Sequence, residues 1–259
     1  MKLKDKVAVI TGAGRGLGRA IAIAMAREGA NVAVMSRTLN ELNAVEEEIA
    51  SAGGRAFVFK GDISRQNDVG RMVAQTTAIF KGVDILVNNA AVIGPARFIE
   101  DTDPEAWDRT IAINLNGAYY CCHAVVPLMI NRGGGKIISI TSGLGKMPYP
   151  RFCAYGVSKA GIIQITRSLS EEFKEMNIQI NAIDPGVMDT GMQAEVRALG
   201  PDKLGKSVYG HFMENKEQGL LKKPALIAEL AVFLASPEAD NLTGFYGRLD
   251  EYRKLGWRG

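Results

Sequence analysis

The sequence predicts an α/β fold in which a doubly wound parallel sheet carries helices on both faces. Short β-branched runs alternate with longer helical patterns along the whole chain, and the first run leads directly into a cluster of glycines. This alternation is typical of parallel strands joined by crossover helices. Strands are expected at residues 7–10, 31–35, 56–60, 85–87, 136–140 and 178–183.

Length and composition indicate one domain over residues 1–259. The chain is 47% hydrophobic, enough for one large core, and no repeat or linker divides it. Its 31 basic and 28 acidic residues are interspersed, which argues against a nucleic-acid or membrane-surface partner. No stretch approaches the roughly 18 apolar residues of a membrane helix, and the start is unlike a signal peptide. We expect a soluble, cytoplasmic protein.

Cysteines and histidines give no sign of a metal site. The three cysteines, Cys121, Cys122 and Cys153, are interpreted as reduced thiols, the first two packed in an apolar stretch. A catalytic thiol is the alternative. The two histidines, His123 and His211, lie far apart without ligand-like spacing, and His123 is expected to be packed in an apolar helix.

Local signals mark several boundaries between elements. Asp103 before Pro104 predicts a helix start, and Gly29 and Gly53 stand where helices should end. Residues 189–224 mix glycines, charges and large apolar residues without a clean period. A segment of that length inside a compact domain is usually functional, so we predict a lid over a substrate site.

The glycine cluster follows the first strand in the sequence TGAGRGLGRA. Gly12, Gly16 and Gly18 fit G-x-x-x-G-x-G, whereas Leu17 and Arg19 break the commoner G-x-G-x-x-G spacing. Glycines there permit a tight turn and close approach of the backbone to a pyrophosphate, and the next helix begins with unpaired N–H groups. The sequence therefore predicts a Rossmann-type dinucleotide site.

The second strand is followed by Ser36 and Arg37, and no acidic residue occurs between Glu28 and Glu41. An acidic side chain near this position usually accepts hydrogen bonds from the adenosine ribose, whereas an arginine accommodates a 2′-phosphate. With Arg15 in the glycine loop, Arg37 predicts NADP(H) rather than NAD(H) as the preferred coenzyme. The alternative is that Arg37 merely starts a solvated helix.

A phenol and an ammonium lie one helical turn apart at Tyr155 and Lys159. Residues four apart on a helix are neighbours, so the lysine charge is expected to lower the pKa of the tyrosine toward working pH. Tyr155 then becomes a candidate general acid and base. Ser142 should end a strand at the ligand-binding edge of the sheet, where its hydroxyl could polarise a carbonyl.

Taken together, these motifs resemble the short-chain dehydrogenase/reductase family along almost the entire chain, and within it the β-ketoacyl carrier-protein reductase-like members. The resemblance is carried by TGAGRGLG at 11–18, Asp62, NNAA at 88–91, Asn114, Ser142, Tyr155 with Lys159, and PGVMDT at 185–190. The resemblance implies hydride exchange at a nicotinamide, with Tyr155 transferring the proton and Ser142 polarising the carbonyl. It also implies that Lys159 binds the nicotinamide ribose and that Asn114 holds a water of the proton path.

The resemblance extends to the remaining coenzyme contacts. It implies that Asp62 contacts the adenine, that Asn89 and Ala90 line the ribose, and that Met188 and Thr190 touch the carboxamide. The full set of implied coenzyme residues is Gly12, Arg15, Gly16, Leu17, Gly18, Ser36, Arg37, Asp62, Ile63, Asn89, Ala90, Tyr155, Lys159, Pro185, Gly186, Met188 and Thr190. Two alternatives stay open: Asn114 could bond a neighbouring backbone, and Asp62 could cap a turn.

The chain departs from the family pattern in two places. Ala91 stands where NNAG is common, and residues 245–259 replace the usual short strand and V-D-G-G-like finish. This tail is expected to place Trp257 where relatives form subunit contacts. The helix from Tyr155 onward looks apolar nearly all round, which predicts burial on both sides and a homodimer or homotetramer.

The resulting functional hypothesis is an NADPH-dependent reductase that interconverts a ketone and a secondary alcohol. The alternatives are a catalytically silent NADP-binding regulatory protein and an NAD-preferring alcohol dehydrogenase. A mostly apolar substrate is expected, because the predicted pocket residues are largely apolar. They are Val92, Ile93, Leu144, Met147, Tyr149, Phe152, Met192, Leu199, Leu204, Tyr209, Phe212 and Met213. Half of them could instead only fasten the lid.

Overall fold

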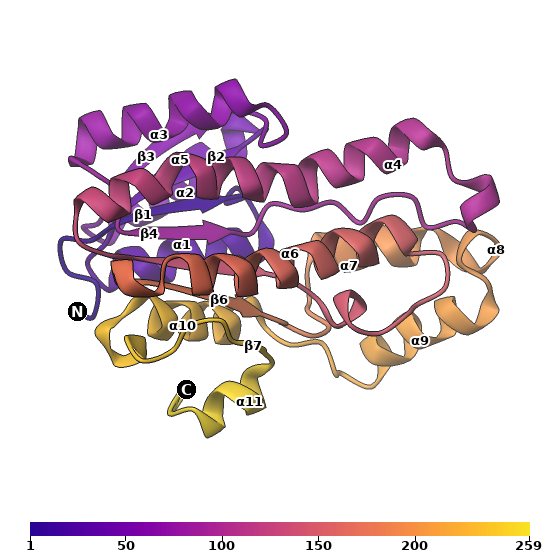
Figure 1. The fold of residues 1–259 in the computed structure, drawn as a ribbon. Helices are drawn as coiled ribbons and strands as arrows, with labels where there is room; N and C mark the ends of the chain where they lie inside the picture. The colour runs from indigo at the N-terminus through magenta and orange to yellow at the C-terminus, as the bar shows by residue number, and fades with distance from the viewer.

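A computed structural model describes residues 1–259 as one seven-stranded parallel sheet between layers of helices (Figure 1). The strand order is β3-β2-β1-β4-β5-β6-β7, so the doubly wound α/β prediction is confirmed. The strands are β1 (Val7–Thr11), β2 (Asn31–Ser36), β3 (Arg55–Lys60), β4 (Ile85–Asn88), β5 (Gly135–Ile140), β6 (Ile178–Ile183) and β7 (Tyr246–Gly247).

The central strands are buried on both faces, which explains why they read as continuous apolar runs. In β1, Ala8 and Ile10 enter one core while Val9 enters the other. The first core is closed by α1 (Gly16–Arg27), α2 (Leu39–Ser51) and α10 (Pro224–Ala235). The opposite face carries α3 (Gln66–Phe80), α5 (Gly117–Asn131) and α6 (Cys153–Glu172).

The helix boundaries predicted from sequence are confirmed. Asp103 caps α4 (Pro104–Ile111) by accepting a hydrogen bond from the Glu105 backbone N–H at 3.2 Å. Gly29 and Gly53 end α1 and α2 with φ values of +90° and +78°, a region that favours glycine. A π-helical turn, Ala112–Asn116, joins α4 to α5.

The strand order reverses beside β1, whose neighbours are β2 on one side and β4 on the other. Connections leave this point toward opposite faces of the sheet, which opens a crevice at the carboxyl ends of the strands. The glycine loop after β1 and the segment after β4 meet there, because Asn89 hydrogen-bonds to Thr11. The topology therefore places the predicted dinucleotide motif at the position where such sheets bind ligands.

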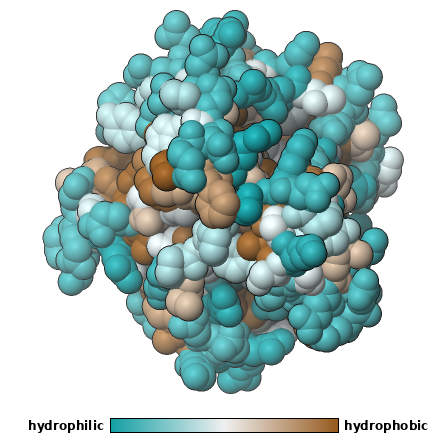
Figure 2. Space-filling view, turned by 90° about the vertical axis from the view of Figure 1, so that its right-hand side faces the viewer, coloured by the Kyte–Doolittle hydropathy of each residue, from teal (hydrophilic) through white to brown (hydrophobic).

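Residues 189–224 form helices rather than the irregular segment expected, so that part of the prediction is wrong. They contain α7 (Gly191–Ala198), α8 (Gly200–Leu204) and α9 (Lys206–Glu217), with a β-bridge between Met188 and Lys222 at their base. Gly200 and Gly205, at φ +71° and +76°, interrupt the helical period and obscure it in the sequence. Figure 2 faces this side of the molecule and shows apolar surface recessed between hydrophilic side chains.

The helices of this segment cover a small apolar cluster of their own. Its buried members are Ala96, Phe152, Tyr155, Val196, Leu204 and Val208. The cluster is distinct from the two cores that flank the sheet. The apolar contacts of this segment are therefore mainly with the residues around Tyr155.

The C-terminal tail contains a short strand, β7, which the sequence analysis did not predict. Tyr246 pairs with Ala182 of β6, and α11 (Leu249–Lys254) follows. The Tyr252 hydroxyl donates to the Ala182 carbonyl at 2.9 Å, and Trp257 is only 4% exposed within the main core. The Trp257 ring is covered by its own chain, and the expected place of the tail at a subunit contact stays a prediction.

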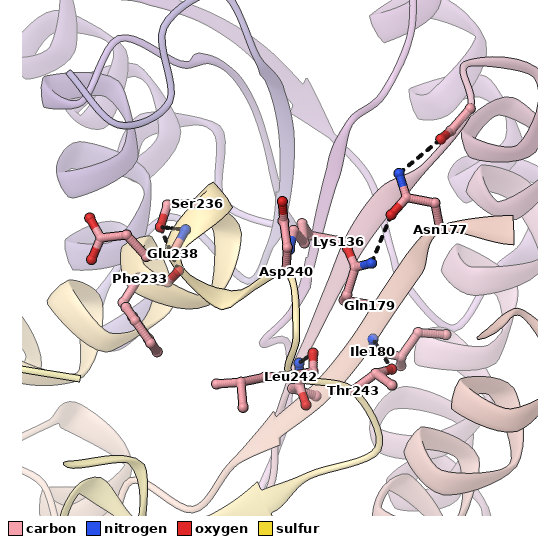
Figure 3. Close-up of polar contacts among 12 residues, drawn as sticks. Lys136, Asn177, Gln179, Ile180, Phe233, Ser236, Glu238, Asp240, Leu242 and Thr243 are labelled. Atoms are coloured by element: carbon pink, nitrogen blue, oxygen red, sulfur yellow. Dashed lines mark hydrogen bonds and ion pairs between the residues drawn. The ribbon is translucent and has the colours of Figure 1, made fainter. Parts of the chain in front are cut away.

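Polar contacts fasten the segment between α10 and β7 to the sheet (Figure 3). Lys136 of β5 donates to Asp240 at 2.6 Å, and Thr243 accepts from the Ile180 N–H at 3.1 Å. Burial lowers the pKa of Lys136, while the Asp240 carboxylate acts in the opposite direction. These contacts set the register in which the tail reaches β6.

Truncation of the Trp257 side chain is expected to destabilise the folded protein. Trp257→Ala should lower the free energy of unfolding by about 3–5 kcal/mol, because it removes a large buried side chain and leaves a cavity. Leu255→Ala, at a 39% exposed position on the same tail, should change it by less than about 1 kcal/mol. Urea denaturation of both variants tests this, and equal losses would contradict the described packing.

The packing expected for Cys121 and Cys122 is confirmed, while that expected for His123 is wrong. Cys121 and Cys122 are buried free thiols, and burial raises the pKa of Cys122 to about 11, which disfavours thiolate chemistry. Cys153 is free and exposed. His123 lies on the exposed side of α5 beside Tyr119 rather than in a packed position. None of the helices combines the length and apolar character needed to cross a membrane.

Candidate active site

The crevice at the carboxyl ends of the strands contains a cavity of about 440 Å³. Of the predicted catalytic and coenzyme residues, only Asn114 is absent from its wall. The wall includes Gly12, Arg15, Gly16, Leu17, Gly18, Ser36, Arg37, Asp62, Ile63, Asn89, Ala90, Ser142, Tyr155, Lys159, Pro185, Gly186, Met188 and Thr190. One cavity therefore joins the glycine loop to the Tyr–Lys helix.

The glycine loop is tightly packed and requires glycine at specific positions. Gly12 and Gly16 have φ values of +63° and +56°. A Cβ at Gly18 would overlap the Gly12 carbonyl oxygen and lie 2.5 Å from Asn89 Nδ2. That amide donates to the carbonyls of Thr11 and Gly12 at 2.9 and 3.1 Å. Thr11, which sequence reasoning missed, accepts from the N–H groups of Asn89 and Ala90 through its hydroxyl.

The loop and the start of α1 fit the pyrophosphate of a dinucleotide. Arg15 precedes α1 in an extended conformation, without a side-chain cap, and the first turn carries no acidic residue. The first N–H groups of the helix therefore remain for an anion, and the helix dipole favours negative charge there. Because Gly12 and Gly18 have no side chains and their surroundings are closely packed, a pyrophosphate in the cavity would face the backbone of this loop.

Asp62 both lines the cavity and caps a turn. Its Oδ1 accepts from the backbone N–H and the hydroxyl of Ser64 at 3.0 and 2.7 Å. Burial would raise the pKa of Asp62, but these hydrogen bonds and the charges of Arg37 and Arg65 lower it overall. The turn-capping alternative is thus correct for one oxygen, and the carboxylate is held ionised on the cavity wall.

Glu41 lies on the cavity wall although sequence reasoning left it out. A Cβ at Gly14 would be 2.8 Å from Glu41 Oε2 and 3.0 Å from Ser36 Oγ, so the carboxylate lies beside this serine. The signal was its place in the first turn of α2, which turns it back toward the end of β2. Arg15 also has a partner, because its guanidinium pairs with Glu195 of α7 at 2.9 Å.

Ser142, Tyr155 and Lys159 meet on the cavity wall, as their spacing predicted. Ser142 follows β5, and its Oγ accepts from the Leu144 N–H at 3.3 Å, which leaves its proton for donation. On α6, the Lys159 ammonium lies 5.6 Å from the centre of the Tyr155 ring and donates to the Ile140 carbonyl at 2.8 Å. Both side chains are buried.

Burial, rather than the lysine charge, dominates the pKa of the tyrosine. It raises the pKa of Tyr155 to about 12, although a hydrogen bond with Ser142 acts in the opposite direction. Burial also lowers the pKa of Lys159 to about 8. The expectation that Lys159 lowers the pKa of Tyr155 toward neutrality is therefore wrong for the protein alone, because the low-polarity surroundings disfavour both charged forms.

Asn114 lies behind the cavity wall with its side chain fully engaged. Its Oδ1 accepts from the Val92 N–H, and its Nδ2 donates to the Val92 carbonyl, each at 2.8 Å. The amide also donates to Ser158 Oγ at 3.1 Å, and that hydroxyl donates to the Tyr155 carbonyl. The side chain therefore ties the wall at Val92 to α6, as the backbone-bonding alternative held, with both of its amide hydrogens engaged.

The end of the cavity beside Tyr155 carries many apolar side chains. Six of the twelve predicted pocket residues lie on its wall: Val92, Ile93, Leu144, Phe152, Met192 and Phe212. Leu199, Leu204, Tyr149 and Tyr209 instead pack with the lid cluster. Gln193, which sequence reasoning missed, lines the cavity with a buried Oε1 that has no partner. An acceptor left unpaired there suits a ligand that brings its own N–H or O–H.

A glycine loop at the reversal point of a parallel sheet, with a buried tyrosine, lysine and serine beside it, defines a dinucleotide-dependent oxidoreductase. Comparison with known proteins agrees: the family described as short chain dehydrogenase matches residues 6–199. The chain belongs to this family, and it is an oxidoreductase of the kind that acts on alcohol and ketone groups with a nicotinamide coenzyme.

Individual relatives span nearly the whole chain. An uncharacterized oxidoreductase of Thermotoga maritima is 35% identical over 252 residues, covering 96% of this chain and 98% of its own. The 3-oxoacyl-acyl-carrier-protein reductase FabG of Staphylococcus epidermidis is 33% identical, covering 93% and 95%. The structure of a 7α-hydroxysteroid dehydrogenase complexed with NADH and 7-oxo glycochenodeoxycholic acid superposes with a TM-score of 0.85 at 31% identity, covering 96% and 94%.

Proposed function

We propose that this chain is an NADP(H)-preferring dehydrogenase/reductase that interconverts a ketone and a secondary alcohol. The observation that carries the proposal is the single cavity that joins the glycine loop to Ser142, Tyr155 and Lys159. A bound nicotinamide coenzyme would supply the hydride. The residues of this chain would bind it, orient the substrate oxygen and move one proton.

The proton is assigned to Tyr155. Its raised pKa, about 12, keeps the phenol protonated near pH 7, so that it can donate a proton to the oxygen of a ketone during reduction. Ser142 would donate a hydrogen bond to the same oxygen as negative charge develops there. Alcohol oxidation, which needs the phenolate, is expected to speed up as pH rises.

Lys159 and Asn114 would assist the proton transfer by Tyr155 without contacting the substrate oxygen. The ammonium of Lys159, buried beside the tyrosine ring, would bind the coenzyme ribose and supply positive charge when the phenol loses its proton. Since the Asn114 side chain is occupied, any water it holds would bind to its main chain. A π-helical turn at this point leaves room for such a role, because it disturbs the regular pairing of carbonyl groups.

The coenzyme preference is proposed from the charges at the adenosine end of the cavity. Arg37 with Ser36 would bind a 2′-phosphate, and Arg15 would assist if it leaves Glu195. Glu41 opposes this, because its carboxylate lies beside Ser36 and could accept hydrogen bonds from an unphosphorylated ribose. Glu41 is thus the specific observation in favour of an NAD-preferring enzyme, the second candidate.

Charge reversal at Arg37 tests the preference. Arg37→Asp is expected to raise KM for NADPH about 10- to 100-fold through loss of charge-assisted hydrogen bonds, and to change KM for NADH little. Glu41→Gln should lower KM for NADPH. Arg65→Gln serves as the control, since Arg65 also faces Asp62 but is absent from the cavity wall. Equal effects of Arg37→Asp on both coenzymes would discard the assignment.

The apolar wall formed by Leu144, Phe152 and Phe212 supports a substrate of medium size and low polarity, enclosed by the lid at 189–224. The test is a screen of cyclic ketones, β-ketoacyl thioesters and polyols, with NADPH and NADH in parallel. Coenzyme binding without turnover of any substrate would instead favour a silent regulatory protein.

The exposed stripe of α6, including Val157 and Ala160, is proposed to contact a second copy of the chain in a dimer or tetramer. Light scattering, which measures the mass of the particle in solution, tests this proposal.

A further inference from the structure

A buried carboxylate lies behind the serine loop, where the proposed reaction does not use it. Asp184 follows β6 and is only 2% exposed. Its Oδ1 accepts from the Gly186 N–H at 2.9 Å, and its Oδ2 accepts from Arg248 Nε at 2.8 Å. Arg248 comes from the C-terminal tail, between β7 and α11. A buried acid thus depends on the chain end for its counter-charge.

The same group of residues contacts the loop that carries Ser142. The Tyr246 hydroxyl lies 3.3 Å from the Ser142 carbonyl and 3.4 Å from Asp184 Oδ2, so its one proton is shared between two acceptors. A Cβ at Gly143 would lie 2.9 Å from Arg248 Nη2 and 3.3 Å from Asp184 Oδ2. The ion pair therefore packs directly against the peptide that follows Ser142.

Asp184 of this ion pair is also electrically coupled to the tyrosine. Burial is the main reason for the raised pKa of Tyr155, and the negative charge of Asp184 raises it further. The other charged group beside the phenol is Lys159, on the same helix. From α7, α8 and α9, the apolar side chains of Val196, Leu204 and Val208 pack in the cluster that contains Tyr155, while Gln193 and Glu195 line the same cavity. Arg248 is the cation that contacts Asp184 directly. Lys146 lies 4.2 Å from the centre of the Tyr246 ring, and Glu251 accepts from the Arg248 backbone N–H.

We infer that Asp184, Arg248 and Tyr246 are positioning residues that hold the Ser142 loop in place and balance the charge behind Tyr155. This inference rests on the proposed function for its catalytic meaning. Asp184 supplies a negative charge, Arg248 offsets it, and the Tyr246 hydroxyl connects the pair to the serine backbone. The tail thereby takes part in proton transfer without touching the cavity.

The test measures ionisation of Tyr155 directly, by NMR of protein labelled with ¹³C at the tyrosine ζ carbon, the resonance being assigned with Tyr155→Phe. Asp184→Asn is expected to lower the midpoint of the Tyr155 titration by about one pH unit, because it removes a nearby negative charge. Arg248→Met should move it in the opposite direction, because it leaves the charge of Asp184 without its partner. Opposite shifts from the two halves of one ion pair are not expected from a purely structural role.

Two further variants keep the test decisive if Asp184→Asn or Arg248→Met folds poorly. Arg248→Lys retains the positive charge and should leave the midpoint of the Tyr155 titration near that of the wild type. Tyr246→Phe should lower kcat with little change in KM for the coenzyme. Arg253→Gln, on the exposed side of α11, controls for net charge and should have no effect. Shifts of the same sign for Asp184→Asn and Arg248→Met, or none in folded protein, would overturn the inference.

Failure of the proposed function would look different. If no alcohol or ketone is turned over, the proposed function fails, but the NMR titration still reports whether the ion pair and the phenol are coupled. If turnover occurs and its pH profile does not move in Asp184→Asn, the proposed function stands and the positioning role is discarded.

Discussion

Replacing Tyr155 with phenylalanine is expected to lower kcat for ketone reduction by about 10²- to 10⁴-fold, the usual contribution of a positioned general acid. The substitution removes one oxygen from a side chain that is otherwise retained in the lid cluster. Affinity for the coenzyme and the unfolding midpoint should change little. Steady-state kinetics, with coenzyme binding followed by fluorescence, would separate the chemical step from binding.

Tyr149→Phe is the matched control for this experiment. Tyr149 packs against Phe152 with ring centres 5.8 Å apart but is absent from the cavity wall. Removal of its hydroxyl should leave kcat within about threefold of the wild type, a change worth less than 1 kcal/mol. If Tyr155→Phe retained full activity, or if both variants lost it equally, the assignment of the proton to Tyr155 would be abandoned.

A methyl group at Gly18 is expected to abolish measurable coenzyme binding at micromolar protein. The Cβ of Gly18→Ala would overlap the Gly12 carbonyl oxygen and crowd Asn89 Nδ2, so the loop must move away from its anion-binding position. The free energy of unfolding should also fall by about 1–3 kcal/mol, as for other overpacked sites. Isothermal titration with NADPH and NADH measures the first effect, and chemical denaturation measures the second.

The control for this variant is Gly70→Ala in α3. A Cβ there meets nothing within 4 Å, and Gly70 lies inside a regular helix. The change should leave coenzyme affinity unaltered and stabilise the protein by about 0.5–1 kcal/mol, since alanine is the better helix former. Unchanged coenzyme affinity in Gly18→Ala would show that the close packing of the loop is not needed for binding.

Local signals in the sequence were sufficient to predict the strands of the sheet and most of the predicted residues that line the cavity. Each predicted strand is present, because short apolar runs between helical patterns carry their own signal, and the glycine spacing marked the loop that follows β1. The two-residue strand β7 was missed for a physical reason. It exists through pairing with β6 and through tail contacts such as Tyr252 to Ala182, none of which is local in sequence.

The same distinction between local and long-range contacts explains which features of the site the sequence did not reveal. Glu41 reaches the cavity because α2 turns back toward β2, and Asn114 is withdrawn from it by two hydrogen bonds to Val92. The pKa of Tyr155 depends on how completely the phenol is buried, which the four-residue spacing from Lys159 does not report. Asp184 and Arg248 are 64 positions apart, so only the fold brings them together.

The apolar cluster beneath α7, α8 and α9 stands apart from the two cores that stabilise the sheet. Substitutions in residues 189–224 are therefore expected to change the stability of the two sheet cores little, and laboratory evolution or segment exchange should tolerate more changes there than elsewhere in the chain. One position limits these changes. Tyr155 belongs to the same cluster, so any replacement segment must still pack against the ring that is proposed to move the proton.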